Sequence, residues 1–312
     1  MTGPNPAPPP PVPMDTARRA RRERLLIVGC GDVGLRVLRQ LAGRWTVLAL
    51  TSSAARVPAL RAAGAVPLVG SLDDPGTLRR LAGVADRVLH LAPPAAQGRD
   101  DARTRRLLQA LSRGAAPLHL VYASTSGVYG DCGGARIDET RPTNPANDRA
   151  WRRVDAETQL RRWGRETGCP VTILRVPGIY AFDREGGHPR ERLAKGLPVL
   201  ARADDVYTNH IQADDLARAC RLALLRGPAG RVIHASDDSE LLMGDYFELA
   251  ARLCGLPPPA RVARADAATV FSPMQMSFMN ESRRMDNGRL KRELRQRLRY
   301  PTPADGLLAV ET

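Results

Sequence analysis

A group of glycines near the start of the chain has the spacing to bind a phosphate group. Gly29, Gly31 and Gly34 form a Gly-x-Gly-x-x-Gly pattern, with Asp32 and Val33 before the last glycine. The first glycine allows a tight turn, the second lets a ligand approach the backbone, and the third lets a helix pack closely on a strand. A helix that begins here would attract the pyrophosphate of a dinucleotide. We therefore predict that Gly29, Gly31, Asp32, Val33 and Gly34 bind a dinucleotide, the alternative being a glycine-rich turn without a ligand.

The residues about twenty positions after the glycines indicate which dinucleotide is bound. A domain that prefers NAD usually has Asp or Glu there, bonded to the ribose. This sequence has Thr51 and Ser52 instead, with Arg56 just beyond. Hydroxyl groups and a guanidinium can hold the 2′-phosphate of NADP. We predict NADP as the cofactor, and NAD remains the alternative if Arg56 is only a surface arginine.

Seven short apolar segments alternate with longer segments of helical period, which is typical of βαβ units around a parallel sheet. Their continuous apolar character suits strands that are buried on both faces. The predicted strands are 25–28, 46–50, 66–69, 87–91, 118–123, 171–176 and 231–235, and the predicted helices are 33–42, 100–112, 148–167, 213–225, 244–253 and 281–298. The pattern predicts an α/β fold with a doubly wound parallel sheet, Rossmann-type, of about seven strands.

The alternation divides the chain into three regions. After Gly178 the alternation of apolar segments and helical segments becomes irregular, because prolines interrupt the helical pattern. We predict an NAD(P)-binding Rossmann domain over 24–178, followed over 179–312 by a smaller substrate lobe interleaved with the last sheet strands. Residues 1–23 are rich in proline and arginine and lack an apolar face, so we expect a disordered and dispensable leader.

Composition argues against several classes of protein. No apolar run approaches the roughly 18 to 20 residues that span a bilayer, so we expect no membrane partner. The five cysteines form no Cys-x-x-Cys pair, which argues against a zinc site or a disulfide framework and favours a cytoplasmic location.

The net charge is +14, but almost all the basic residues are arginines that accompany many alanines, glycines and prolines. This pattern is expected of a coding sequence rich in G and C, so we expect a small-molecule substrate rather than nucleic acid. A homodimer is one possible assembly.

The chain resembles the extended short-chain dehydrogenase/reductases, also called the NAD-dependent epimerase/dehydratase family, over about residues 25–308. Beyond the glycines, the resemblance rests on Gly70-Ser71-Leu72-Asp73, on Leu91-Ala92-Pro93, on the segment YASTSGVYG at 122–130, on LRVPGIY at 174–180 and on HIQADDLA at 210–217. These matches together are more specific than any one of them. The resemblance implies that Asp73 lies near the adenine and that Leu91 and Ala92 contribute to the cofactor site.

The active site of that family pairs a Ser or Thr with a Tyr-x-x-x-Lys motif on the following helix. The Ser or Thr lies four residues before the tyrosine of Val-Tyr-Gly, which corresponds to Thr125 in this sequence. Its hydroxyl would hydrogen-bond a substrate oxygen, the alternative being a hydroxyl that only caps its own backbone. The second motif is absent, because Arg149 stands in the place of the tyrosine and Arg153 in the place of the lysine.

This replacement changes the chemistry that the resemblance implies. Tyrosine can act as a general acid or base, whereas arginine stays protonated and can only bind an anion or polarise a carbonyl. We predict an NAD(P)-dependent oxidoreductase or epimerase/dehydratase-like enzyme for a small polar metabolite such as a nucleotide-sugar, with Thr125, Arg149 and Arg153 at the catalytic site. The alternative is a non-catalytic NADP-binding sensor or assembly protein.

Overall fold

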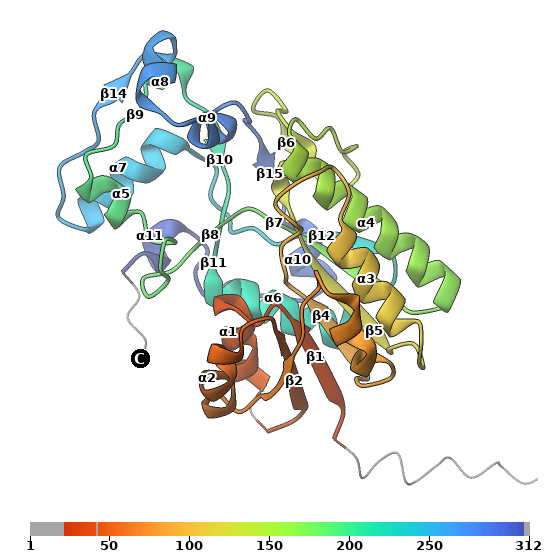
Figure 1. The fold of residues 1–312 in the computed structure, drawn as a ribbon. Coiled ribbons are helices and arrows are strands. Elements are labelled where there is room, and N and C mark those ends of the chain that lie inside the picture. Colours follow the sequence, from red (N-terminus) through yellow and green to blue (C-terminus); the bar gives the residue numbers. More distant parts are fainter. Residues whose placement is uncertain (1–21, 42, 309–312) are drawn as a thin grey trace, which may run out of the picture.

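A computed structural model describes residues 22–41 and 43–308 of the chain. Figure 1 shows a sheet with helices on both faces, and a smaller lobe that lies beyond one end of the strands. The predicted leader lies outside the described residues, apart from Arg22 and Glu23.

Seven parallel strands form the central sheet, in the order β12-β7-β5-β4-β1-β2-β3. They are β1 (Arg24–Val28), β2 (Thr46–Thr51), β3 (Val66–Val69), β4 (Arg87–His90), β5 (His119–Thr125), β7 (Val171–Val176) and β12 (Arg231–His234). The doubly wound α/β fold and all seven predicted strands are thus confirmed. Because every pair in this sheet is parallel, the carboxyl ends of the strands meet at one edge, where such folds bind ligands.

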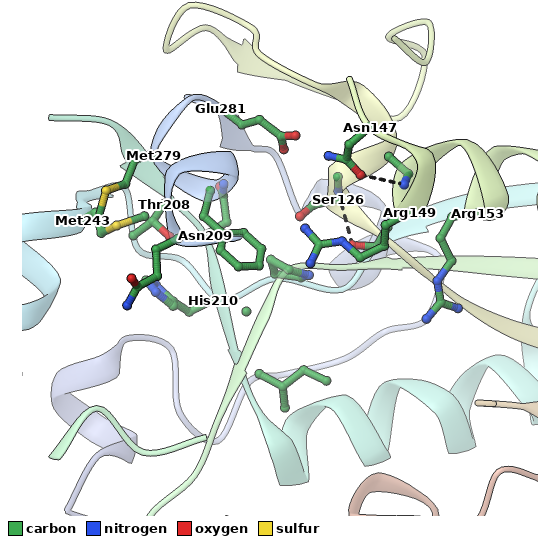
Figure 2. A pocket seen from close by; sticks show the side chains of 18 of the residues that line it. Ser126, Asn147, Arg149, Arg153, Thr208, Asn209, His210, Met243, Met279 and Glu281 are labelled. Carbon is green, nitrogen blue, oxygen red and sulfur yellow. Dashed lines mark hydrogen bonds between the residues drawn. The ribbon is translucent and has the colours of Figure 1, made fainter. Parts of the chain in front are cut away.

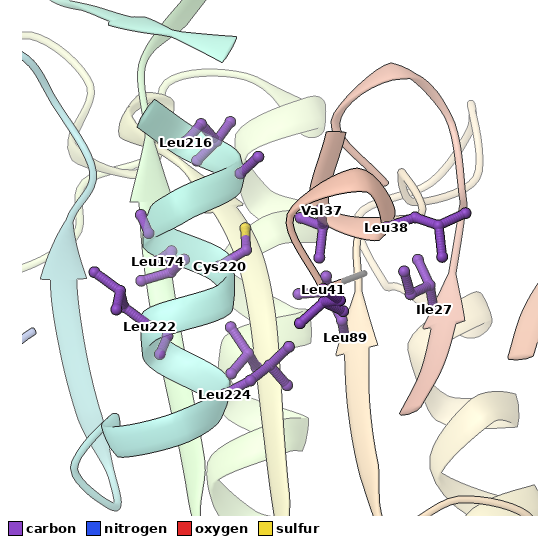
Figure 3. Packing of buried hydrophobic residues seen from close by; sticks show 14 of the residues in the cluster. Ile27, Val37, Leu38, Leu41, Leu89, Leu174, Leu216, Cys220, Leu222 and Leu224 are labelled. Carbon is purple, nitrogen blue, oxygen red and sulfur yellow. The ribbon is translucent and has the colours of Figure 1, made fainter. Parts of the chain in front are cut away.

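Helices cover both faces of the sheet, and alternate strand residues form a separate core on each face. One core contains Leu25 and Ile27 of β1 and packs against α1 (Asp32–Leu41), α2 (Val57–Ala62) and α6 (Ala213–Arg226). Figure 3 shows this packing, with Leu216 and Cys220 of α6 beside the strand residue Leu174. The other core contains Leu26 and Val28 and packs against η3 (Pro75–Leu81), α3 (Ala102–Leu111) and α4 (Asp148–Thr167). The inner strands are therefore apolar on both sides, as the sequence pattern indicated, whereas Val66 and Val69 of the edge strand β3 are exposed.

The chain after β7 contributes both to the sheet and to the lobe. The first elements are β8 (Gly178–Tyr180), α5 (Arg190–Ala194), β9 (Val199–Leu200), η5 (Arg202–Asp204), β10 (Tyr207–Thr208) and β11 (His210–Gln212), before α6 and β12 return to the sheet. The later elements are β13 (Leu241–Leu242), α7 (Met243–Leu253), β14 (Arg261–Val262), α8 (Arg264–Val270), α9 (Pro273–Met279) and α11 (Pro303–Gly306). The lobe and the sheet are thus joined by several chain crossings.

The predicted helix over 281–298 is wrong. Its first part contains the short strand β15 (Arg284–Met285), which pairs with β6 (Arg136–Ile137), and only α10 (Gly288–Arg292) is helical. Arg295 has a positive φ of 48°, which interrupts helical backbone after α10. Leu290 and Leu294 are both buried in the core that includes α6. Their four-residue spacing imitates a long helix, but pairing with β6 and the turn at Arg295 determine the backbone.

A buried ion pair anchors α4 to the sheet. Glu157 of α4 and Arg175 of β7 have side chains that are 4% and 3% exposed. Arg175 donates from Nε to Oε1 at 3.1 Å and from Nη2 to Oε2 at 2.7 Å, and Ser124 of β5 donates to Oε1 at 2.7 Å. Such bidentate geometry and an additional hydrogen bond are what a buried pair needs to offset its desolvation. The pair therefore fixes where α4 lies along the carboxyl ends of β5 and β7.

We predict that Glu157→Leu lowers the free energy of unfolding by about 3 to 5 kcal/mol, because it leaves Arg175 buried without a counter-charge. Urea denaturation measures the loss, and Glu157→Leu combined with Arg175→Met should recover most of it. The control is Glu166→Leu on the same helix, which removes the partner of Arg162 in an exposed ion pair and should leave the midpoint unchanged. A wild-type midpoint in Glu157→Leu would contradict the prediction.

Candidate functional site

The glycines of the turn after β1 are needed for two different reasons. Two of them allow close packing within the protein, and one leaves open space beside the backbone. Gly29 has a φ of 84°, and a Cβ there would lie 2.5 Å from the backbone nitrogen of Ala92. A Cβ at Gly34 would lie 3.1 Å from Sγ of Cys30. At Gly31, in contrast, a Cβ would meet no heavy atom of the described residues within 4 Å. Packing thus explains the first and third glycines, whereas the second leaves room for a pyrophosphate to approach the backbone, so this turn fits a dinucleotide.

The end of β2 lies beside this turn. Arg56 donates from Nη2 to the carbonyl oxygen of Cys30 at 2.8 Å, so its guanidinium reaches the glycine turn. Thr51 is buried, and its hydroxyl accepts from the backbone nitrogen of Ser53 at 3.2 Å. Ser52 is exposed. Of the three residues that the sequence predicted to hold a 2′-phosphate, Arg56 has the charge and the position to do so.

Asp32 begins α1 and belongs to a network of charged side chains. It accepts from Nε of Arg36 at 3.0 Å and also from Nη1 of Arg184. Arg36 is only 2% exposed, lies 2.9 Å from the carboxylate of Asp214 in α6, and also pairs with Asp183. The network links the first turn of α1 to the start of α6 and to the segment after β8. It also holds Arg184, which lines the cavity described below, close to the N-terminus of α1.

Asp73 and the residues after β4 are held together by one arginine. Arg103 donates to both carboxylate oxygens of Asp73, from Nε at 2.9 Å and from Nη2 at 2.6 Å, and to the carbonyl oxygen of Pro93 at 3.2 Å. These hydrogen bonds hold the pKa of Asp73 below its usual value. Leu91 donates its backbone N–H to Val28, while Ala92 packs against Gly29. Arg103 therefore holds the predicted adenine residue beside the segment that follows β4.

A cavity of about 820 Å³ lies at the carboxyl ends of the central strands, between the sheet and the lobe. Pro93 follows β4, Thr125 ends β5 and Gly178 follows β7, and all three line it. Figure 2 shows Arg149 and Arg153 of α4 on one side, with Met243 and Met279 of the lobe on the other. The three residues predicted to be catalytic thus meet at one cavity.

Thr125 has both the position and a free donor for the predicted role. Its Oγ1 accepts from the backbone nitrogen of Gly127 at 3.3 Å and so caps the short helix η4 (Ser126–Tyr129). The capping alternative is therefore present in the structure. Because a hydroxyl can accept and donate at once, the Thr125 proton remains available to an oxygen in the cavity.

Arg153 is held at the end of the sheet by a tyrosine that the sequence analysis did not select. Its Nη1 donates to the hydroxyl oxygen of Tyr122 and to the carbonyl oxygen of Ala123, both at 2.9 Å. Tyr122 is fully buried, and burial raises its pKa to about 12. Tyr122 is not among the residues that line the cavity, so its phenol does not meet a substrate there as the catalytic tyrosine of the family would. Tyr122 instead positions Arg153.

Arg149 lies one helical turn before Arg153 on the same face of α4 (Figure 2). Its guanidinium carbon lies 4.7 Å from the centre of the Phe278 ring in α9. Within the described residues it makes no side-chain hydrogen bond and no ion pair. It is therefore a cation that reaches from α4 toward the lobe and can bind an anion in the cavity.

Two further groups in the cavity were not predicted to act there. His210 stacks on Tyr246 with ring centres 3.9 Å apart, and burial lowers the pKa of its imidazole to about 3, so it is neutral at pH 7. Arg283 donates to Glu281 at 2.9 Å and to the hydroxyl of Ser126 at 3.3 Å. His210 belongs to a segment that resembles the family, but nothing in the spacing of His210 and Arg283 indicated that the fold brings both to the cavity of Thr125.

Residues 22–41 and 43–308 contain no group of three or more His, Cys, Asp or Glu side chains arranged to hold a metal ion. No helix in these ranges is long and apolar enough to cross a membrane.

The parallel sheet, the glycine turn and the cavity at the carboxyl edge define a Rossmann-type α/β protein. Residues 25–235 match the model of the NAD dependent epimerase/dehydratase family. The chain belongs to this family, and the resemblance stated from the sequence is confirmed.

Three similar proteins illustrate the range of the family. A conserved protein of unknown function from Silicibacter pomeroyi has a structure with a TM-score of 0.77 and 31% identity, covering 91% of this chain and 96% of that one. A dTDP-glucose 4,6-dehydratase double mutant from Streptomyces venezuelae, solved with NAD bound, has a TM-score of 0.73 and 25% identity, covering 91% and 94%. A 3-diazoavenalumate denitrifying reductase from a Streptomyces species is 26% identical over 305 residues, which cover 91% of this chain and 99% of that protein.

We predict different effects for substitutions at Arg153 and Thr125. Arg153→Ala should weaken cofactor binding roughly tenfold or more if Arg153 keeps the contact with the nicotinamide ribose that the resemblance implies for the lysine it replaces. Thr125→Val should spare cofactor binding and lower turnover, because its hydrogen bond operates chiefly in the transition state. Fluorescence titration and steady-state kinetics measure the two effects.

Arg162→Ala is the matched control for Arg153→Ala, because Arg162 is exposed on the same helix and should not affect the cofactor. Full activity of Thr125→Val on a confirmed substrate, or wild-type cofactor affinity of Arg153→Ala, would disprove the corresponding assignment.

Proposed function

We propose that the protein is an NADP-dependent enzyme of the oxidoreductase or epimerase/dehydratase kind, acting on a small polar and anionic metabolite. One observation carries the proposal. The glycine turn that fits a pyrophosphate and the cavity lined by Thr125, Arg149 and Arg153 lie at the same edge of the sheet. A dinucleotide bound at the turn can therefore extend toward these three side chains.

The residues that would hold the cofactor favour NADP over NAD. Arg56 reaches the glycine turn, and no carboxylate follows β2, where Thr51, Ser52 and Ser53 stand. A guanidinium suits a 2′-phosphate, whereas a domain that prefers NAD places a carboxylate there. Related solved structures contain NAD, which makes NAD the alternative that the experiment below decides.

Different side chains of the cavity bind the substrate and orient it. A bound nicotinamide supplies or accepts a hydride. Thr125 donates a hydrogen bond to the reacting oxygen of the substrate, while Arg149 and Arg153 bind negative charge and orient the substrate. Because both arginines stay protonated, the proton that completes the reaction comes from water or from another acid.

The similar proteins support a substrate class, and the cysteines support a cellular location. Relatives include a UDP-glucose 4-epimerase solved with UDP-glucose, a dTDP-glucose 4,6-dehydratase and a reductase, so a nucleotide-sugar or another small metabolite is the proposed substrate class. All five cysteines are unpaired, which supports the proposed cytoplasmic location. Assembly as a homodimer stays a prediction.

The deciding experiment compares binding of the cofactor with its consumption. Purified protein is mixed with NADPH or NADH and with a panel of sugars, aldehydes, ketones and nucleotide-sugars, while absorbance at the nicotinamide band is followed. Consumption of the cofactor, or conversion of any member of the panel without net consumption, supports the enzyme, because an epimerase or dehydratase regenerates its cofactor in each cycle. Tight binding with neither consumption nor conversion across the panel would favour the non-catalytic sensor, for which the loss of the Tyr-x-x-x-Lys pair is the supporting observation.

We predict that NADPH binds more tightly than NADH. Arg56→Ala should reduce the difference between the two affinities. A lost charged contact of this kind is worth about 1.5 to 3 kcal/mol, or roughly ten- to a hundredfold in affinity. Calorimetry measures both cofactors on both proteins. Arg61→Ala, an exposed arginine in α2, is the control and should preserve the wild-type ratio. Equal affinities in the wild type, or an unchanged ratio in Arg56→Ala, would contradict the assignment.

A further inference from the structure

The cavity contains an arginine that no carboxylate of the described chain neutralises. Arg192 of α5 donates from Nη2 to the carbonyl oxygen of Pro198 at 2.7 Å. Its Nε is buried and has no hydrogen-bond partner within the described residues. Burial lowers the pKa of its guanidinium, because the charge is removed from water without an ion pair. A partly buried cation of this kind is costly unless a further group completes its surroundings.

Aromatic rings surround Arg192 where a carboxylate would be expected. Its guanidinium carbon lies 4.6 Å from the centre of the Phe247 ring and 5.9 Å from that of Phe271. These cation–π contacts hold the guanidinium in place but leave its charge uncompensated. Arg192 and Phe247 both line the cavity that Thr125 lines.

The other charges of the cavity cannot compensate Arg192. Glu281 is the only carboxylate among the described lining residues, and it already pairs with Arg283 at 2.9 Å. Arg184 is matched by Asp32, and Arg149 has no carboxylate partner within the described part of the chain. The cavity as a whole is therefore short of negative charge.

The remaining wall of the cavity is largely apolar. Met243 and Met279 lie side by side on the lobe side (Figure 2), packed into the same cluster as Phe271. Phe247 and Phe278 continue this surface. Flexible methionines and aromatic rings accommodate a flat apolar body.

Two amides that line the cavity already have partners within the chain. Asn209 uses both ends of its amide, donating to the carbonyl oxygen of Arg283 at 2.9 Å and accepting from the nitrogen of Met285 at 2.8 Å. Asn147 accepts from the nitrogen of Ala150 as the N-cap of α4. A hydroxyl placed against the methionines and phenylalanines of the lobe side would find no partner in those side chains, which costs binding energy.

Among the anionic metabolites considered above, we propose that the substrate of this cavity is a small carboxylate with a flat apolar body rather than a nucleotide-sugar, and that Arg192 binds its carboxylate. The apolar body lies against Met243, Met279 and Phe247, which leaves the opposite end of the molecule toward Thr125 and Arg149. The position of the reacting end rests on the proposed function, whereas binding of the carboxylate to Arg192 does not require turnover.

The test uses trans-cinnamate, its uncharged amide cinnamamide, and UDP-glucose as probes. Each is titrated calorimetrically into the whole chain, with and without NADPH. We expect cinnamate to bind at least tenfold more tightly than cinnamamide and more tightly than UDP-glucose. In Arg192→Met, which keeps an unbranched apolar stem, the preference for the acid should disappear while affinity for the amide remains. Arg192→Lys should retain part of the preference, which separates loss of charge from loss of fold.

Arg190→Met is the matched control, because Arg190 is exposed on the same short helix. This variant should bind all three probes as the wild type does. Equal binding of acid and amide, tighter binding of UDP-glucose, or an acid preference that survives Arg192→Met would each overturn the proposal. Failure of the proposed function is distinguishable, because NADPH would then be neither bound nor consumed while cinnamate still binds in an Arg192-dependent way.

Discussion

The buried pair of Glu157 and Arg175 is the contact on which the candidate site depends. It fixes α4 against β5 and β7, and Ser124 completes the coordination of the carboxylate. Glu157, Arg153 and Arg149 follow one another at intervals of four residues, so they share one face of α4. With Glu157 held in the sheet, Arg153 necessarily reaches the end of β5 and Arg149 reaches the cavity. A buried ion pair, whose charges must be desolvated, thus sets the position of the two arginines that we propose bind the substrate.

A second set of contacts joins the glycine turn after β1 to the segments that lead into the lobe. The close approach of Gly29 to Ala92 brings the turn after β1 against the end of β4. From the same turn, Asp32 and Arg36 connect α1 to Asp214 of α6 and to the segment after β8. The glycine turn and the cavity are therefore parts of one framework. Within the described residues, the cavity combines arginines that have no carboxylate partner, Arg149 and Arg192, with an apolar wall on the lobe side.

The sheet and the glycine turn could be predicted because their signals are local. Strands buried on both faces need continuous apolar runs, and a dinucleotide turn needs glycines at fixed spacing. The helix expected over 281–298 was wrong because Leu290 and Leu294 imitate helical spacing, whereas pairing of β15 with β6 decides the backbone. The roles of Tyr122 and Arg192 could not be predicted, because each depends on contacts between segments far apart in the chain. The replacement of the Tyr-x-x-x-Lys pair was visible in the sequence, but only the fold showed what holds Arg153.

The central claim is that a dinucleotide bound at the glycine turn extends into the cavity bordered by the arginines of α4. A crystal structure of the chain in complex with NADPH tests this claim most directly. The account predicts the pyrophosphate against Gly31, the 2′-phosphate beside Arg56, and the nicotinamide ribose within hydrogen-bonding distance of Arg153, with the ring facing Thr125. A nicotinamide that lies outside the cavity, or no bound dinucleotide at saturating NADPH, would contradict it.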